Sequence, residues 1–178
     1  MSDAARIRRL ESIGERELDG LCDVLVDCVL GGDSVGFMFP MTREKAETFW
    51  RGVGASLARR ERIVLGAFDP ADALVGTVSV VFAQPENQPH RADVAKLLVH
   101  RHSRRRGVGA ALLGAAEAEA QRAGRTLLVL DTASADAERL YDRGGWKRCG
   151  TIPDYALMPD GPLCATTVFH KRLESSHL

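Results

Sequence analysis

The sequence has no charge excess, few aromatic residues and no long apolar run. Its 178 residues contain 24 Lys+Arg and 24 Asp+Glu, so the formal net charge is zero. This balance excludes the broad basic surface of a general nucleic-acid coat, although it allows a local basic patch. No apolar run reaches the ~18 residues that span a bilayer, and the segment MSDAARIRRLESIGERE lacks the apolar stretch of a secretory signal. We expect a cytoplasmic protein with neither a nucleic-acid nor a membrane partner.

Cysteine is also scarce, and its spacing is that of isolated residues. Cys22, Cys28, Cys149 and Cys164 form no CxxC pair and show no metal-like spacing with histidine. Without a secretion signal these residues are interpreted as free thiols in a reducing compartment. The sequence therefore predicts neither a disulfide framework nor a metal site.

Hydrophobic residues make up 45% of the chain, which is enough for a sizeable core in one domain over residues 1–178. Apolar spacing of three and four residues alternates with short apolar runs, which predicts an α+β fold without a linker. The run TLLVLD is nearly all apolar, which is typical of a central strand buried on both faces. Strands are expected at residues 5–13, 63–68, 73–83, 93–99, 126–131, 146–151 and 164–173, and helices at 18–29, 42–57, 107–123 and 134–145.

The segment LLVHRHSRRRGVGAALL carries the clearest chemical signal. An apolar strand runs into three arginines, then Gly107 and Gly109 open an Ala/Leu-rich helix. Glycines let a backbone approach a ligand closely, and the first helical turn offers unpaired N–H groups to an anion. Leu112 replaces the third glycine of a dinucleotide fingerprint, and no GxxxxGK[ST] motif is present. A solvated basic run or a nucleic-acid patch is the plainer alternative for the arginines.

Two motifs resemble one family. The pattern Arg-x-x-Gly-x-Gly after a strand is similar to the acetyl-CoA signature of the GNAT superfamily of N-acetyltransferases, and SADAERLYDRGGW is similar to its second motif. The second motif is matched by Ala137, Leu140, Tyr141, Gly145 and the aromatic Trp146, while Ser134 stands where asparagine is usual. The segments GGDSVGFM, NQPHRADVAKLLV and PDGPLCATTVFHKRL look like the tabtoxin-resistance group within this superfamily.

The resemblance implies a fold and a cosubstrate. The fold is a central, mixed, mostly antiparallel twisted sheet of about seven strands flanked by about four helices. The pantetheine arm of acetyl-CoA would lie along the strand 93–99, and its pyrophosphate on the N–H groups of residues 104–109. The implied cofactor-binding residues are Leu97, Leu98, Val99, Arg104, Arg105, Arg106, Gly107, Val108, Gly109, Ala110, Ser134, Ala137 and Tyr141.

The resemblance also suggests how protons are handled. Tyr141 would be the general acid toward the departing thiolate, since pKa values of ~10 and ~8.5 allow transfer within a hydrogen bond. Its alternative is a core aromatic residue whose hydroxyl bonds a carbonyl. The substrate ammonium must lose a proton, and Asp93, Asp131 or a water chain could accept it. The alternatives are a strand-end carboxylate paired with Arg91 for the first, and a capping or turn residue for the second.

The function expected is direct acetyl transfer from acetyl-CoA to a small amine, with an amino-acid-like toxin or antibiotic as the sharper hypothesis. A protein or peptide amine, and a non-catalytic acyl-CoA sensor, are the alternatives. The loop at 36–38 and the segment 155–160 are expected to wall the acceptor pocket, with plain surface loops as the alternative. The sequence leaves open whether the protein forms a homodimer.

Overall fold

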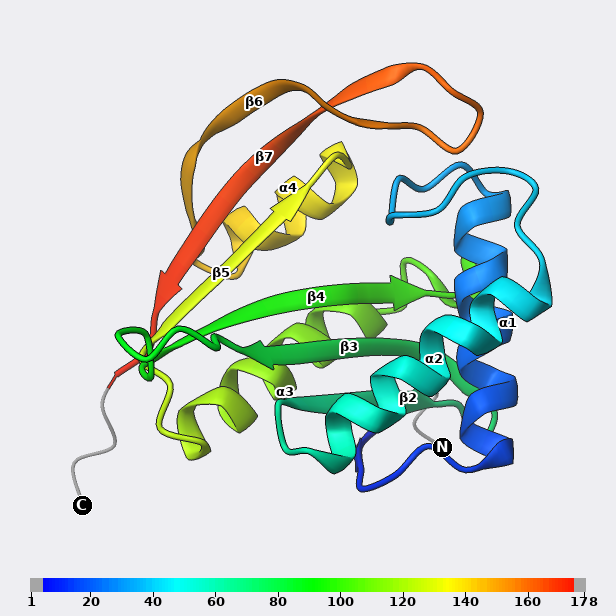
Figure 1. Cartoon of the computed structure of the whole chain (residues 1–178), viewed down its shortest axis with the longest axis horizontal. Coiled ribbons are helices and arrows are strands. Elements are labelled where there is room, and N and C mark those ends of the chain that lie inside the picture. Colours follow the sequence, from blue (N-terminus) through cyan, green and yellow to red (C-terminus); the bar gives the residue numbers. More distant parts are fainter. Residues whose placement is uncertain (1–4, 175–178) are drawn as a thin grey trace.

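The computed structural model describes residues 5–174, so the expected domain limits at 1 and 178 lie outside it. Strands and helices follow one another in the expected order (Figure 1). The elements are β1 (Arg6–Leu10), α1 (Glu15–Leu30), α2 (Arg43–Ala58), β2 (Arg62–Phe68), β3 (Leu74–Phe82), β4 (Arg91–Val99), the short 3-10 helix η1 (Arg101–Ser103), α3 (Val108–Arg122), β5 (Leu127–Thr132), α4 (Ala135–Arg143), β6 (Lys147–Leu157) and β7 (Leu163–Arg172).

The seven strands form one twisted sheet in the order β1-β2-β3-β4-β5-β7-β6. Only β4 and β5 are parallel, and all other neighbours are antiparallel. One core cluster joins α3 and α4 to the sheet, and a second joins α1 and α2 to it. The mixed, mostly antiparallel sheet with four helices is confirmed. Within residues 5–174 no helix combines the length and apolarity needed to cross a bilayer.

The helix boundaries follow local signals in the sequence. Thr42 caps α2, because its side chain accepts a hydrogen bond from the backbone N–H of Lys45. At the other end of the preceding loop, α1 stops at Gly31, and Gly32 takes a φ of +91°. Both signals lie in the local sequence next to the helix ends.

The parallel pair β4–β5 separates soon after it forms. Its register runs only from Arg91 opposite Leu127 to Asp93 opposite Val129. Beyond that point the two strands diverge into a V, which Figure 1 shows between the green and yellow arrows. The backbone groups on the facing edges therefore have no strand partner across the V, and unpaired strand edges can bind an extended ligand.

The expectation that residues 126–131 are buried on both faces is wrong. Leu128 and Leu130 are buried, whereas Val129 is half-buried and Asp131 is exposed. The reason is that α3 and α4 cover one face of β5, while α1 and α2 pack over β2–β4 and leave the other face open. The leucine- and valine-rich composition of β5 does not show that one of its faces is left uncovered by helices.

Strand β6 is longer than the expected 146–151 and continues to Leu157. Pro153 and Asp154 obscured this continuation in the sequence. The structure accommodates them in a register irregularity between Ile152 and Ala156, where Asp154 has a φ of +52°. Part of the expected pocket-wall loop at 155–160 is therefore strand.

One-sided burial of β5 has a measurable consequence. Leu128→Ala removes a side chain that is 0% exposed and should lower the free energy of unfolding by about 2–5 kcal/mol. Val129→Ala, the adjacent control on the open face, should lower it by about 1 kcal/mol. Chemical denaturation of both variants checks this, and equal losses would contradict the assignment of an open face.

Candidate active site

The candidate site lies where the V formed by β4 and β5 is widest. Because the two strands are parallel, the helices that follow them, α3 and α4, both start at this edge of the sheet. Helix N-termini carry free N–H groups and a positive dipole end. An extended ligand between the strands would therefore meet two helix N-termini at one end of the cleft.

The loop that enters α3 has the backbone conformation expected of an anion site. Arg105 and Gly107 have φ values of +61° and +79°, and α3 begins at Val108 with no side-chain cap on its free N–H groups. A turn of this kind points successive N–H groups outward, and a phosphate satisfies them. The loop residues thus fit a ligand that carries phosphate.

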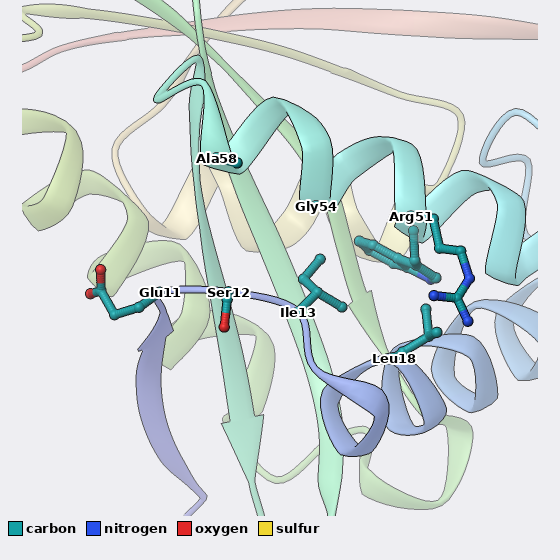
Figure 2. A pocket seen from close by; sticks show the side chains of 8 residues that line it. Glu11, Ser12, Ile13, Leu18, Arg51, Gly54 and Ala58 are labelled. Carbon is teal, nitrogen blue, oxygen red and sulfur yellow. The ribbon is translucent and has the colours of Figure 1, made fainter.

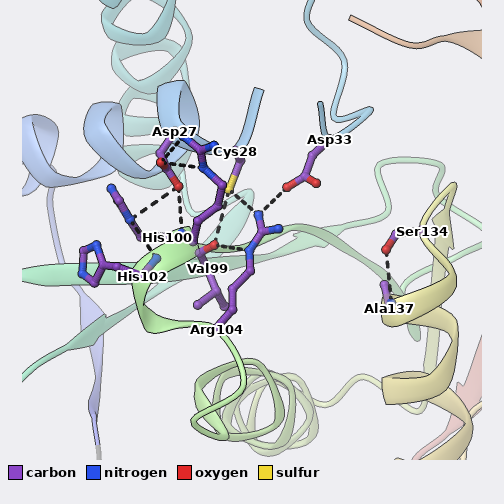
Figure 3. A network of polar contacts seen from close by, with 10 residues as sticks. Asp27, Cys28, Asp33, Val99, His100, His102, Arg104, Ser134 and Ala137 are labelled. Carbon is purple, nitrogen blue, oxygen red and sulfur yellow. Dashed lines mark hydrogen bonds and ion pairs between the residues drawn. The ribbon is translucent and has the colours of Figure 1, made fainter. Parts of the chain in front are cut away.

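The three arginines of this loop have different environments. All three are exposed, but Arg104 also bonds to other parts of the protein: its Nε donates to the Val99 carbonyl at 2.9 Å, and its Nη2 donates to Asp33 and to the Cys28 sulfur (Figure 3). Arg105 and Arg106 have no hydrogen-bond or ion-pair partner within residues 5–174. Arg104 therefore anchors the loop to the end of β4 and to the α1–α2 connection, which the sequence did not indicate.

On the other side of the cleft, α4 begins at Ser134. Its Oγ accepts a hydrogen bond from the Ala137 backbone N–H at 3.3 Å, so this serine is the N-cap of α4 (Figure 3). Gly109 lies close to the same helix, because a Cβ at this position would be 3.4 Å from the Leu140 Cδ2 atom. Small residues at 109, 134 and 137 leave little side-chain bulk on the sides of the cleft.

Tyr141 is buried beneath the cleft. Its exposed fraction is 5%, and its ring packs against Phe169 and Trp146 at centroid distances of 5.5 and 5.9 Å. Burial raises the pKa of Tyr141 to about 12, and the charge of Asp131 contributes. Within residues 5–174 no carbonyl accepts its hydroxyl proton, so the alternative of a satisfied core tyrosine finds no partner.

The two candidate carboxylates lie on the open face of the sheet. Strand alternation directs them away from the face that carries α3 and α4. Asp131 accepts a hydrogen bond from Thr166 Oγ1 at 2.7 Å, and Asp93 accepts one from Arg91 Nη1 at 2.5 Å. The pairing of Asp93 with Arg91, which the sequence offered as an alternative, is present. Asp131 has a neutral partner and Asp93 a cationic one.

Two segments far apart in sequence meet across the wide end of the V (Figure 1). The Phe39 backbone N–H donates to the Pro159 carbonyl at 3.0 Å, and Ser34 Oγ donates to the Leu157 carbonyl at 3.1 Å. We call this contact between the α1–α2 loop and the β6–β7 hairpin the bridge. It includes both segments that were expected to wall an acceptor pocket.

One half-buried residue at this site was not singled out from the sequence. Lys96 lies in the middle of β4, and its Nζ is 5.5 Å from the centre of the Phe49 ring. The only signal was a single charge within the apolar run of VAKLLV. Strand periodicity could not show which face that charge would occupy.

A separate depression of about 330 Å³ lies between the β1–α1 connection and α2 (Figure 2). Ile13, Leu18 and Trp50 contribute apolar surface to it, and Glu11 and Arg51 contribute charge. None of its lining residues belongs to β4, β5 or the helices that follow them, so the depression is distinct from the cleft.

A helix start with free N–H groups lies beside two parted parallel strands, with a buried tyrosine beneath them. Comparison with family models identifies a protein with this arrangement as an acetyltransferase. The model of the "Acetyltransferase (GNAT) family" matches residues 31–146. The chain belongs to the GNAT family of acetyltransferases.

Comparison with known proteins agrees with this assignment. The chain is 31% identical over 128 residues to an uncharacterized N-acetyltransferase of Azospirillum brasilense, which covers 70% of this chain and 73% of the relative. It superimposes on a Salmonella typhimurium acetyltransferase solved with its cofactor acetyl-CoA (TM-score 0.78, 16% identity, 98% and 96% of the two chains). A ribosomal-protein-alanine N-acetyltransferase of Brucella melitensis is also similar (TM-score 0.78, 22% identity, 94% and 99%). At these identities the two structures establish the fold alone.

The loop geometry predicts the effect of replacing Gly107. Gly107→Val places a branched side chain at a φ of +79°, beside the free N–H groups of α3. The substitution should raise the dissociation constant for coenzyme A by at least about tenfold, because the N–H groups must move. Isothermal titration calorimetry measures this change.

Gly124→Val is the matched control. Gly124 follows the C-terminal end of α3, has a φ of +74° and, like Gly107, has open space around it. Both variants should lose about 1–2 kcal/mol of stability to backbone strain. Only Gly107→Val should lose affinity. If the two variants bound coenzyme A equally well, the loop would not be the phosphate site.

Proposed function

We propose that this protein transfers the acetyl group of acetyl-CoA directly to the amine of a small molecule, with both substrates bound together. Acetyl-CoA supplies a thioester, whose acyl carbon is open to attack by a neutral amine. The observation that carries the proposal is the buried Tyr141, whose hydroxyl has no protein partner within residues 5–174, beneath the parted strands. Family membership and the similarity to a structure solved with acetyl-CoA support it.

The residues around the cleft fit coenzyme A in two parts. The free edge of β4 at Leu97–Val99 would take the extended pantetheine arm, and the loop 104–109 with Ala110 would take the pyrophosphate. Ser134 and Ala137 at the start of α4 would contact the arm from the other strand. In this arrangement Arg105 and Arg106 supply charge, while Arg104 holds the loop in place.

Tyr141 serves as the proton donor in this proposal. With its pKa raised to about 12 by burial, it keeps its proton throughout the neutral and mildly alkaline range. Burial and the negative charge of Asp131 disfavour any anion at this position. A departing sulfur anion next to the hydroxyl is therefore more basic than in water, and it takes the proton that Tyr141 donates.

Asp131 and Asp93 are the candidate carboxylates for binding the ammonium group of the acceptor and accepting its proton. A protonated amine is attracted to the open face by the charge of Asp131, whose hydrogen-bond partner Thr166 is neutral. Arg91 compensates the charge of Asp93. We therefore place the amine next to Asp131, from which its proton passes to the carboxylate or to water, and we assign Asp93 the second position.

The bridge supports a small acceptor rather than a protein chain. Backbone and side-chain hydrogen bonds of 3.0 and 3.1 Å join the α1–α2 loop to the β6–β7 hairpin across the acceptor side. A polypeptide would need this contact to open, whereas a small amine would not. The resemblance to the tabtoxin-resistance group leads us to propose an amino-acid-like acceptor.

The proposal is tested by binding and turnover measured together. Acetyl-CoA should bind in calorimetry, and thiol release should follow with members of a panel of small amines that includes tabtoxinine-like amino acids. Peptides with free N-termini or lysines form the comparison set. Acetyl-CoA binding without thiol release with any amine would favour a non-catalytic sensor. Thiol release with peptides alone would show that the acceptor is a peptide amine and not a small molecule. No binding of acetyl-CoA would refute the proposal.

Tyr141→Phe separates catalysis from packing. The phenylalanine keeps the ring contacts with Phe169 and Trp146 but removes the acidic hydroxyl. The turnover number should fall by roughly 10²–10⁴-fold, with acetyl-CoA affinity and melting temperature close to those of the wild type. Stopped-flow or steady-state thiol assays measure the change. Unchanged turnover would show that Tyr141 is not the proton donor.

A further inference from the structure

Lys96 occupies an irregular position in β4, at the centre of the cleft. Its φ is +52°, and the register with β3 shifts between Ser79 opposite Ala95 and Thr77 opposite Leu98. This shift has a visible effect on side-chain direction. Val94 packs in the core under α3, whereas Leu98 packs in the core under α1 and α2, although a regular strand would direct residues four apart to the same face.

The Lys96 side chain lies on the acceptor side of the sheet. Its Nζ is 5.5 Å from the centre of the Phe49 ring on α2. The same atom would be 3.7 Å from a Cβ placed on Gly36, which belongs to the α1–α2 loop and hence to one side of the bridge. The ammonium group thus lies next to α2 and to the α1–α2 loop, which forms one side of the bridge.

The charge of Lys96 is not neutralised by a direct partner. Within residues 5–174 no carboxylate lies within ion-pair distance of its Nζ. Burial lowers the pKa of Lys96, the charge of Asp131 opposes that shift, and Arg62 adds to it. The Phe49 ring face also favours the cation. A half-buried ammonium without a counter-ion stabilises an anion brought to it.

We propose that Lys96 is an acceptor-binding residue that selects amines carrying a carboxylate or similar oxyanion. The inference rests on the proposed N-acetyl transfer and names its substrate class. Lys96 on β4 provides the positive charge, and Asp131 on β5 provides the negative charge across the V. A zwitterionic amino acid matches both, because its carboxylate would face Lys96 and its ammonium would face Asp131. The absence of a side chain at Gly36 leaves space next to Nζ.

The test compares Lys96→Met with the wild type on two acceptors, an amino acid that the wild type acetylates and the carboxamide of the same amino acid. Lys96→Met should lower kcat/KM for the amino acid by roughly 10- to 100-fold, mainly through KM. For the carboxamide the change should stay within about threefold. Each ratio compares two enzymes on one substrate, so the different basicity of the two amines cancels.

Three controls separate the loss of the Lys96 charge from other effects of the substitution. Lys96→Arg keeps the cation and should restore most of the affinity for the amino acid. Lys147→Met removes an exposed lysine from β6 and should leave both ratios unchanged. Acetyl-CoA affinity and melting temperature of Lys96→Met should match those of the wild type, which shows that the variant folds and holds its cosubstrate.

The outcomes separate the two proposals. Equal losses for the amino acid and its carboxamide would overturn the anion-binding role and would point to Lys96 as a proton acceptor. The proposal would also be overturned if the wild-type enzyme acetylated only amines that carry no carboxylate or other oxyanion. A wild type that binds no acetyl-CoA or releases no thiol with any amine would refute the proposed transfer itself.

Discussion

The parting of β4 and β5 after a short parallel pairing is the constraint on which the rest of the site depends. Three register pairs, from Arg91–Leu127 to Asp93–Val129, join the two halves of the sheet directly. Past the last pair, the facing backbone groups have no strand partner. Since unpaired backbone groups are costly when buried, this cleft stays open to water or takes an extended ligand. Because β4 and β5 are parallel, the starts of α3 and α4 also lie at the same edge of the sheet.

The separated halves are held at a fixed spacing by contacts far from the pairing. Arg104 joins the loop 104–109, the proposed phosphate site, to the end of β4 and to Asp33 in the α1–α2 loop. That loop in turn contacts the β6–β7 hairpin through the bridge. The α1–α2 loop thus links the proposed phosphate site on one side of the cleft with the proposed acceptor wall on the other.

The charges in the cleft act on one another. Asp131 contributes to the raised pKa of Tyr141 and opposes the lowering of the pKa of Lys96, both of which burial dominates. One carboxylate therefore helps to keep a proton on Tyr141, the proposed donor, and a charge on the proposed anion-binding lysine. Within residues 5–174 no hydrogen bond or ion pair joins Asp131 to Tyr141 or to Lys96, so these charges act on one another through space.

The sequence alone determined the order of elements, the glycine-rich loop and the family. Spacings of three and four residues, Thr42 as a cap and Gly31–Gly32 as a stop are local signals, and local chemistry is enough to read them. Only the tertiary structure decided that β5 is open on one face, that Arg104 bonds inward and that β6 runs on to Leu157. The same holds for Lys96, which a bulge places in the cleft. These features depend on partners distant in sequence, and no periodicity within one strand records where its neighbour departs.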